Sequence, residues 1–384
     1  MVWDVIVLGL GGVGSAAIRH LAKRGAKVLG IDQHPPVHSL GSSHGRTRIV
    51  RQAYFEDPLY VPLLKRAYEL WDNLSYEMSR DLFIRCGVLQ VGPANGIVVP
   101  GVVDAAEEHG LRIQMMDRGD VQSRWPAIGC PEGASAVFEE NAGFVHVESC
   151  VESQLASAVR AGATCLHESP VESWQLESDG VRVTMPDATF FTQHLVIAGG
   201  AWSRDLLSLE HTLPIRVLRK HLYWFDSDRS GLEVNAGFPC FFHETVEGCF
   251  YGFPILDELG VKVAMHTGGV EVNPPGSMQR SDYQAASDQC DGQLLEYENV
   301  AKYVTRLLPG VSTRLNRRDS CYYSMSPDSN FFVDHLGDGS PVTVIAGLSG
   351  HGFKFTPVLG EIAAMMALGE TVPFDLSPFR LNRF

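Results

Sequence analysis

The sequence predicts a mixed α/β (α+β) fold that combines a domain built on a parallel sheet with a second domain built on an antiparallel sheet. A strand, a glycine-rich turn, a helix and a second strand follow one another at the N-terminus, and two later apolar segments end in glycines. These features indicate a parallel sheet assembled from separate parts of the chain. A hairpin pattern within residues 248–266 indicates the antiparallel sheet. The length of 384 residues is sufficient for both.

The N-terminal pattern is a complete βαβ dinucleotide fingerprint. An apolar strand at 5–8 leads into "GLGGVG" (9–14) and a helix over 15–23, and a second strand closes on Asp32. Gly9 permits the tight turn, Gly11 lets backbone N–H groups approach a pyrophosphate, and Gly14 allows helix and sheet to pack closely. Asp32 is placed to accept ribose hydroxyls. A glycine turn without a ligand is the alternative, but the flanking strands and the acid favour a dinucleotide.

Two further apolar segments, 194–202 and 342–350, end in glycines like strands buried on both faces of the same parallel sheet. Segments with alternating strands and turns lie between these pieces, near 86–145 and 216–320. We therefore predict a discontinuous dinucleotide-binding domain formed by 1–85, 146–215 and 321–384. The second domain, which would bind substrate, comprises 86–145 and 216–320.

Composition excludes several classes of partner. Acidic residues outnumber basic ones by 45 to 31, so the net charge of −14 disfavours nucleic acid. No apolar run approaches the ~20 residues that cross a bilayer, which predicts no membrane partner. The eight cysteines form no CxxC pair, which argues against a metal site and suits a reducing compartment. With no basic leader at the N-terminus, the cytoplasm is the expected location.

Three arginines follow a glycine turn in "SSHGRTRIVRQAYFED" (42–57). For Arg46, a solvated basic loop is the preferred interpretation. If residues 47–54 are extended, Arg48 and Arg51 point to opposite faces, so that one could meet a cofactor and the other a substrate.

The strand of the hairpin with the sequence "VKVAMH" (261–266) places Lys262 and His266 on one face. Base rates favour a solvated face for such a pair. Tyr251 on the partner strand supports the alternative, in which this face forms the wall of a site.

Lys354 lies between two phenylalanines and follows three glycines. Thr356 and Pro357 are predicted to be the N-cap and first residue of a helix that Gly369 ends, so the helix N-terminus would point back at 350–354. Backbone donors, the helix dipole and an ammonium group would then converge, which predicts an anion site.

Together these motifs resemble the amine-oxidising flavoproteins of the monomeric sarcosine oxidase and N-methyltryptophan oxidase family. The resemblance runs from Asp4 to Phe384 and includes "GSSHGRTRIVRQAY", "YVPLLKRAYELW", "FYGFP", "KVAMHTGG", "CYYSMSPD" and "GLSGHGFKF". It implies that the first domain is a Rossmann-like FAD-binding domain rather than one for NAD. The tail "FDLSPFRLNRF" is most similar to the N-methyltryptophan branch.

The resemblance also implies roles for individual residues. Arg51 and Lys354 match the pair that holds the substrate carboxylate, and Cys321 matches the cysteine bonded to the flavin 8α carbon. Lys262 matches the position where oxygen is activated, and Arg48 lies near the flavin ring. The residues that match the lining of the amine pocket are Tyr251, His266 and Tyr323. The positions implied to contact the cofactor are Gly9, Gly11, Gly12, Val13, Gly14, Asp32, Ser42, Thr47, Arg48, Val171, Gly200, Trp202, Cys321, Gly347, Gly350, Gly352, Phe353 and Lys354. Ser43 and Arg46 depart from the family pattern, in which a histidine and an acid are frequent.

The expected function is therefore an FAD-dependent oxidase of N-methyl amino acids such as sarcosine or N-methyltryptophan. The products would be an imine, which gives formaldehyde and an amino acid, and hydrogen peroxide. One alternative is a flavin oxidase or dehydrogenase of a cyclic amine (pipecolate-like) or a D-amino acid. Another is a non-catalytic nucleotide-binding or assembly protein. The expected partners are a small amino-acid substrate and O2, with the protein acting as a monomer.

Overall fold

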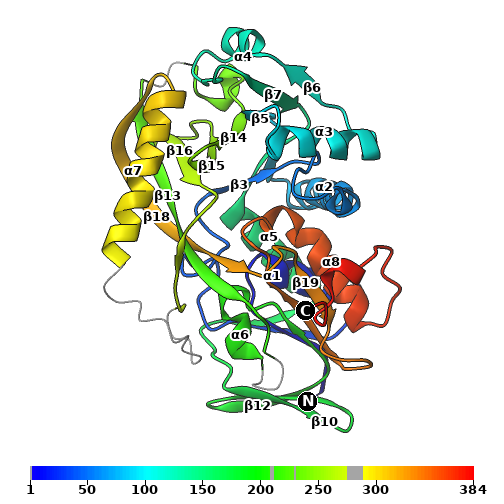
Figure 1. Cartoon of the computed structure of the whole chain (residues 1–384). Helices are drawn as coiled ribbons and strands as arrows, with labels where there is room; N and C mark the ends of the chain where they lie inside the picture. The colour runs from blue at the N-terminus through cyan, green and yellow to red at the C-terminus, as the bar shows by residue number, and fades with distance from the viewer. Residues whose placement is uncertain (1, 208–211, 229–230, 275–288) are drawn as a thin grey trace.

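The computed structural model describes residues 2–207, 212–228, 231–274 and 289–384, and its strands form three sheets (Figure 1). Parts of the two predicted domains, at 208–211, 229–230 and 275–288, lie outside the described residues. The predicted fold class is confirmed, because one sheet has a parallel centre and another is mainly antiparallel.

The first sheet has eight strands. Its strands, in order across the sheet, are β10 (Ser173–Glu177), β11 (Gly180–Met185), β12 (Ala188–Ile197), β1 (Val2–Leu8), β2 (Val28–Ile31) and β9 (Thr164–Leu166). β20 (Val342–Ala346) pairs with β12 in parallel, and β19 (Phe332–His335) pairs with β20. The predicted strands at 5–8, 194–202 and 342–350 therefore lie in one sheet.

Side chains on both faces of this sheet are buried. Val5 and Val7 of β1 belong to one core cluster, together with residues of α1 and α8, whereas Ile6 and Leu8 belong to another. The helices of the described residues are α1 (Gly12–Lys23), α2 (Val61–Met78), α3 (Val98–His109), α4 (Arg118–Arg124), α5 (Val147–Arg160), α6 (Ser203–Leu206), α7 (Gln289–Leu307) and α8 (Thr356–Ala367). The same part of the chain contains five short 3-10 turns: η1 (Pro58–Tyr60), η2 (Gly200–Trp202), η4 (Val234–Ala236), η5 (Phe353–Phe355) and η6 (Ser377–Phe379).

The second sheet has nine strands, and it includes the predicted hairpin. Its order is β17 (Val270–Glu271), β13 (Arg216–Ser227), β16 (Val261–Met265), β15 (Gly248–Phe253), β14 (Cys240–Thr245), β5 (Val88–Pro93), β7 (Ala134–Glu139) and β6 (Gln114–Met116). β18 (Val311–Met325) pairs with β13. α3, α4 and α7 lie in segments from which the sequence predicted only strands and turns.

The long antiparallel pair β13 and β18 extends from the second sheet toward the first (Figure 1). α7 packs against β18 on the outer side of this pair. The predicted domain boundary between 320 and 321 falls within β18, and the division into domains remains a prediction.

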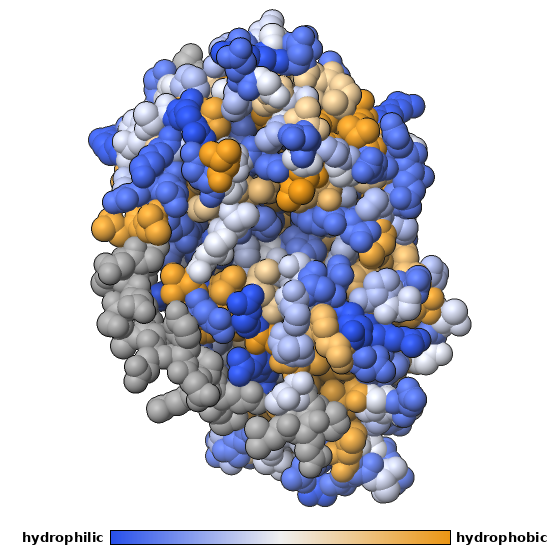
Figure 2. All heavy atoms as spheres, viewed as in Figure 1, coloured by the Kyte–Doolittle hydropathy of each residue, from blue (hydrophilic) through white to orange (hydrophobic). Residues whose placement is uncertain are grey.

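A small third sheet consists of β3 (Thr47–Val50), β8 (Gly143–His146) and β4 (Phe83–Ile84), in that order. On the face shown in Figure 2, hydrophobic residues form separate groups among hydrophilic ones. Among the described residues, no helix combines the length and apolar character that a membrane span requires.

Candidate active site

A cavity of about 470 Å³ begins at the carboxyl ends of β1, β12 and β20 and extends to the β13–β18 pair. Parallel sheets bind ligands at this edge. Most of the predicted site residues line it: Gly9, Gly11, Gly12, Val13, Asp32, Ser42, Arg48, Arg51, Val171, Gly200, Trp202, Tyr251, His266, Tyr323, Gly347, Gly350, Gly352, Phe353 and Lys354. Gly14, Thr47, Lys262 and Cys321 are not part of the lining.

Glycines make the first end of the cavity accessible to backbone groups. Gly9 has a φ of +88°, and a Cβ there would lie 2.5 Å from the carbonyl oxygen of Ala198. A Cβ at Gly14 would lie 1.7 Å from the carbonyl oxygen of Gly9, so only glycine allows α1 to begin so close to β1. This cradle between a strand and a helix N-terminus fits the pyrophosphate of a dinucleotide.

Asp32 lies beside the cradle and stabilises it. Its carboxylate accepts hydrogen bonds from the backbone N–H groups of Leu10 (2.7 Å) and His34 (2.8 Å). The side chain is buried at the cavity wall, where remaining lone pairs can accept from a ribose. At the same end, the imidazole of His34 meets the ring of Trp202 edge-on, with 5.1 Å between the ring centroids.

Arg51 lies at the opposite end of the cavity. The chain is in strand β3 only as far as Val50, because the buried carboxylate of Glu139 accepts the N–H groups of Gln52 and Ala53 and turns the backbone. The condition for placing Arg48 and Arg51 on opposite faces, an extended segment over 47–54, is therefore met only as far as Val50. Both arginines line the same cavity.

The Arg51 guanidinium makes two hydrogen bonds of 2.8 Å to Glu56, an acid that the sequence analysis did not identify. Burial would raise the pKa of Glu56, but the charges of Arg51 and Lys354 hold it near 2. Glu56 is therefore ionised. In the sequence, Glu56 is marked only by its position five residues after Arg51, and that spacing alone does not predict that the two side chains pair.

Lys354 shares an aromatic ring with Arg51. The ammonium lies 5.1 Å, and the guanidinium 4.6 Å, from the centroid of Tyr54. The Lys354 ammonium donates to the carbonyl oxygen of His351 at 2.9 Å. The backbone of Lys354 is held by Trp71, whose Nε1 donates to the Lys354 carbonyl oxygen. Burial, together with the charge of Arg51, lowers the pKa of Lys354 to about 7.

The helix that follows Lys354 begins differently from the prediction. The 3-10 turn η5 continues directly into α8, so Thr356 is already helical and Phe355 is the N-cap. The hydroxyl of Thr356 donates to the carbonyl oxygen of Phe353 and caps no N–H group. Pro357 lies in the first turn, one position later than expected.

Lys262 lies one layer behind the cavity and is buried, so the preferred interpretation of a solvated strand face is wrong. Its ammonium donates to the carbonyl oxygens of Gly45 (2.6 Å) and Thr47 (2.9 Å) and to Thr47 Oγ1 (3.1 Å). Burial and the charge of Arg48 lower the pKa of Lys262, but three acceptors match the three N–H groups of the charged form. Arg48 in turn donates to the carbonyl oxygens of Thr47 and Ser42. Arg46, in contrast, is partly exposed and pairs with Asp257.

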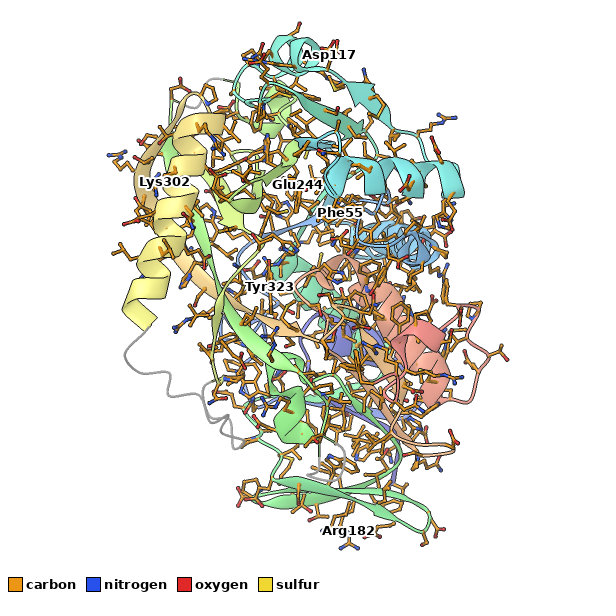
Figure 3. The ribbon with its side chains drawn as sticks, viewed as in Figure 1. Phe55, Asp117, Arg182, Glu244, Lys302 and Tyr323 are labelled. Atoms are coloured by element: carbon orange, nitrogen blue, oxygen red, sulfur yellow. The ribbon has the colours of Figure 1, made fainter. Side chains whose placement is uncertain are left out.

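Polar aromatic side chains form the remaining wall. Tyr323 lies near the centre of the molecule in Figure 3, and its hydroxyl is 3.4 Å from His266 Nδ1. Burial lowers the pKa of His266 to about 3, so the imidazole is neutral and can accept a proton in a hydrogen bond. Tyr251 lies opposite Ala264, between Lys262 and His266 on the neighbouring strand.

Cys321 is buried on the same face of β18 as Tyr323. Burial raises the pKa of its thiol, and the positive charges of Arg48, Lys262 and Lys220 lower the pKa by less than burial raises it. Lys220 lies directly across the strand pair and is also buried, a cation that the sequence analysis missed. Nothing in the local pattern "LRKHLYW" (218–224) distinguished it from a surface lysine.

Residues 4–366 match the family described as FAD dependent oxidoreductase. The chain belongs to this family. An N-methyl-L-tryptophan oxidase of Salmonella agona is 38% identical and covers 100% of both chains. A monomeric sarcosine oxidase of an Arthrobacter species is 35% identical over 99% of this chain and 96% of its own. The resemblance inferred from the motifs is thereby confirmed.

Solved structures of other oxidases share the fold. NikD, an unusual amino acid oxidase essential for nikkomycin biosynthesis, has a TM-score of 0.83 with 22% identity, covering 99% of this chain and 97% of that one. Glycine oxidase from Geobacillus kaustophilus has a TM-score of 0.78 with 18% identity, covering 100% and 99%. This FAD-dependent oxidoreductase therefore presents a glycine cradle that fits the cofactor of its family, with cations and polar aromatics at the far end of the same cavity.

Proposed function

We propose that this FAD-dependent oxidoreductase oxidises N-methyl amino acids such as sarcosine or N-methyltryptophan. One observation carries the proposal: Arg51 and Lys354 line the same cavity as the dinucleotide cradle, and their cationic groups lie 4.6 and 5.1 Å from the centroid of the Tyr54 ring. The two cations fit a carboxylate, and relatives with 35–38% identity are named for N-methyl amino acids. We expect a monomer that acts in the cytoplasm, with the amino acid and O2 as its partners.

The side chains of the cavity define how a substrate would be held. Arg51 and Lys354 bind the carboxylate of the substrate. The Arg51 guanidinium, which donates to Glu56 in the structure, then donates to the substrate carboxylate as well as to Glu56 or in place of it. Neutral His266 and the hydroxyls of Tyr251 and Tyr323 surround the amine and exclude water from it. Fixing the reacting C–H bond in this way is worth ~7–11 kcal/mol of barrier. FAD held at the glycine cradle would supply the acceptor for two electrons, with O2 as the final oxidant, so that the products would be an imine and hydrogen peroxide. Hydrolysis of the imine gives formaldehyde and the amino acid.

An anaerobic substrate panel tests the proposal. Sarcosine, N-methyltryptophan, pipecolate, a D-amino acid and a primary L-amino acid are each added to the holoenzyme, and bleaching of the flavin absorbance is recorded. The proposal requires fastest bleaching with an N-methyl amino acid and peroxide release after O2 is admitted. Preference for pipecolate or the D-amino acid would favour those substrates instead, and absence of bleaching with every amine would indicate a non-catalytic protein.

The lowered pKa of Lys354 predicts a pH dependence for carboxylate binding. In the free enzyme the ammonium is present below pH ~7 and is lost above it, and a bound carboxylate favours the charged form. The affinity for acetate, which has no amine to titrate, should therefore fall by up to ~tenfold per pH unit above pH ~7. Flavin difference spectra measure this affinity. Lys354→Met should bind more weakly at low pH and show no such slope, and a flat profile in the parent enzyme would contradict the assignment.

We further propose that the flavin is covalently bound through Cys321. Acid precipitation of the purified protein should leave the yellow colour in the pellet, and a tryptic peptide containing Cys321 should carry the mass of flavin. Cys321→Ser should release the colour to the supernatant, whereas Cys150→Ser, at another buried thiol, should not. Flavin that is wholly soluble after precipitation of the parent protein would show that Cys321 forms no such bond.

A further inference from the structure

Two thiols meet near the start of neighbouring strands, behind the wall of the active cavity and outside its lining. The sulfur atoms of Cys86 and Cys240 are 3.8 Å apart, although 154 positions separate the residues in sequence. Cys240 opens β14, which pairs with β5 so that Cys240 lies opposite Val88. The backbone N–H of Cys240 donates to the carbonyl oxygen of Gly87 at 3.1 Å. The sheet therefore fixes the two backbones next to each other.

This arrangement suits a disulfide. Bonded sulfurs are ~2.05 Å apart, so closure requires an approach of less than ~2 Å, which rotation of the side chains can supply. Both cysteines are free thiols in the structure.

The two thiols differ in access and acidity. Cys86 is half-buried, whereas Cys240 is fully buried. The hydrogen bond with Cys240 lowers the pKa of Cys86, and burial raises the pKa of Cys240. Cys86 is therefore the more accessible and the more acidic of the two thiols, so a small oxidant reaches it first, and the Cys240 sulfur lies next to the product.

The pair also lies close to the place where oxygen would be reduced. Cys240 and its partly buried neighbour Cys86 pack in the core cluster that includes Tyr251 and Tyr323, two side chains of the cavity wall. The ammonium of Lys262 acts on the Cys240 thiol through its charge.

We propose that Cys86 and Cys240 form a peroxide-sensitive dithiol, which the enzyme's own hydrogen peroxide oxidises to a disulfide. The choice of oxidant rests on the proposed function. The Cys86 thiolate attacks one peroxide oxygen, the O–O bond breaks, and sulfenic acid and hydroxide form. The Cys240 thiol then attacks the Cys86 sulfur, an S–S bond forms, and the sulfenic oxygen leaves as water. In sum, two thiols and one peroxide give one disulfide and two waters.

Peptide mapping of the holoenzyme, with its cysteines initially in the thiol form, tests the proposal. The protein is exposed to added hydrogen peroxide, its remaining thiols are alkylated, and the digest is analysed without reductant. A peptide containing Cys86 should be joined to one containing Cys240, with the loss of ~2 mass units that accompanies disulfide formation. Dithiothreitol should reverse the change. Cys86→Ser and Cys240→Ser should each abolish the cross-link, whereas Cys165→Ser, at another half-buried thiol, should leave it intact.

A second arm uses turnover with an N-methyl amino acid, with and without catalase, while peroxide release is measured. Closure without catalase and protection by catalase would support the proposal. Measured peroxide without closure would overturn it, and so would added peroxide that leaves both cysteines alkylated or that joins other cysteines. If no peroxide is released, the proposed function fails, and the arm with added peroxide still decides whether the dithiol exists.

Discussion

Replacing Lys262 by methionine should slow the reaction of the reduced enzyme with O2 by about 100-fold or more, while reduction by the amine continues at a similar rate. Electron transfer to neutral O2 creates negative charge, and a fixed ammonium stabilises charge that appears only in that step. Loss of one such preorganised group typically costs ~10²–10³ in rate. The ammonium of Lys262 is held rigidly by three oxygen acceptors in a buried position.

Stopped-flow absorbance separates the two halves of this cycle. Anaerobic bleaching by the amine reports the first, and return of the oxidised spectrum on mixing with O2 reports the second. Lys302→Met is a matched control, because Lys302 is exposed on α7 (Figure 3). If Lys262→Met regains its oxidised spectrum as fast as the parent enzyme, Lys262 is a structural residue that anchors the loop at 45–47.

The second large effect is expected at Arg51 and Lys354, the pair that we call the carboxylate clamp. Arg51→Ala and Lys354→Ala should each raise the apparent KM strongly while FAD remains bound. Losing a charged hydrogen bond in a buried site costs ~2–5 kcal/mol, which corresponds to at least about 30-fold in affinity. Steady-state kinetics together with the flavin content of the purified variants measure both quantities.

Glu56 requires its own control in this experiment. Arg51→Ala leaves the Glu56 carboxylate in the cavity without its partner, where it would repel a substrate carboxylate. The double variant Arg51→Ala with Glu56→Gln removes that repulsion, so a KM that stays high identifies the loss of Arg51 itself. Arg182→Ala, at an exposed arginine on β11 that does not line the cavity and lies at the end of the molecule away from Phe55 (Figure 3), should change nothing. Unchanged kinetics in Arg51→Ala or Lys354→Ala would rule out that residue as part of the clamp.

The parallel sheet and its cradle could be predicted because local sequence determines them. The glycines of "GLGGVG" have steric roles that no other residue fills, and a strand buried on both faces is apolar throughout. The hairpin that contains Lys262 was predictable for the same reason, since alternation and a turn are local signals.

The environment of individual side chains was not predictable in this way. In the sequence, Lys262 resembled a lysine on a solvated face, because the oxygens that accept its hydrogen bonds belong to residues more than 200 positions away. Glu56 and Lys220 acquired importance only through partners that the fold brings near. The Cys86–Cys240 contact likewise depends on the parallel pairing of β14 with β5. Periodicity shows which face a residue occupies, but it does not show what covers that face.

The strands and loops that form the cavity lie far apart in the sequence, and this affects how the protein folds during synthesis. β1, whose end forms the cradle, emerges first, whereas β20 and the segment that carries Lys354 emerge last and complete the same sheet beside β12. Contacts between such distant segments form slowly, since long loops must close before any native pairing is gained. While the ribosome is still adding residues 198–340, β12 lacks its neighbour β20 and α1 lacks the helix α8 that packs against it, so apolar surface stays exposed. We therefore expect a nascent chain that depends on chaperones until almost all of it has left the exit tunnel.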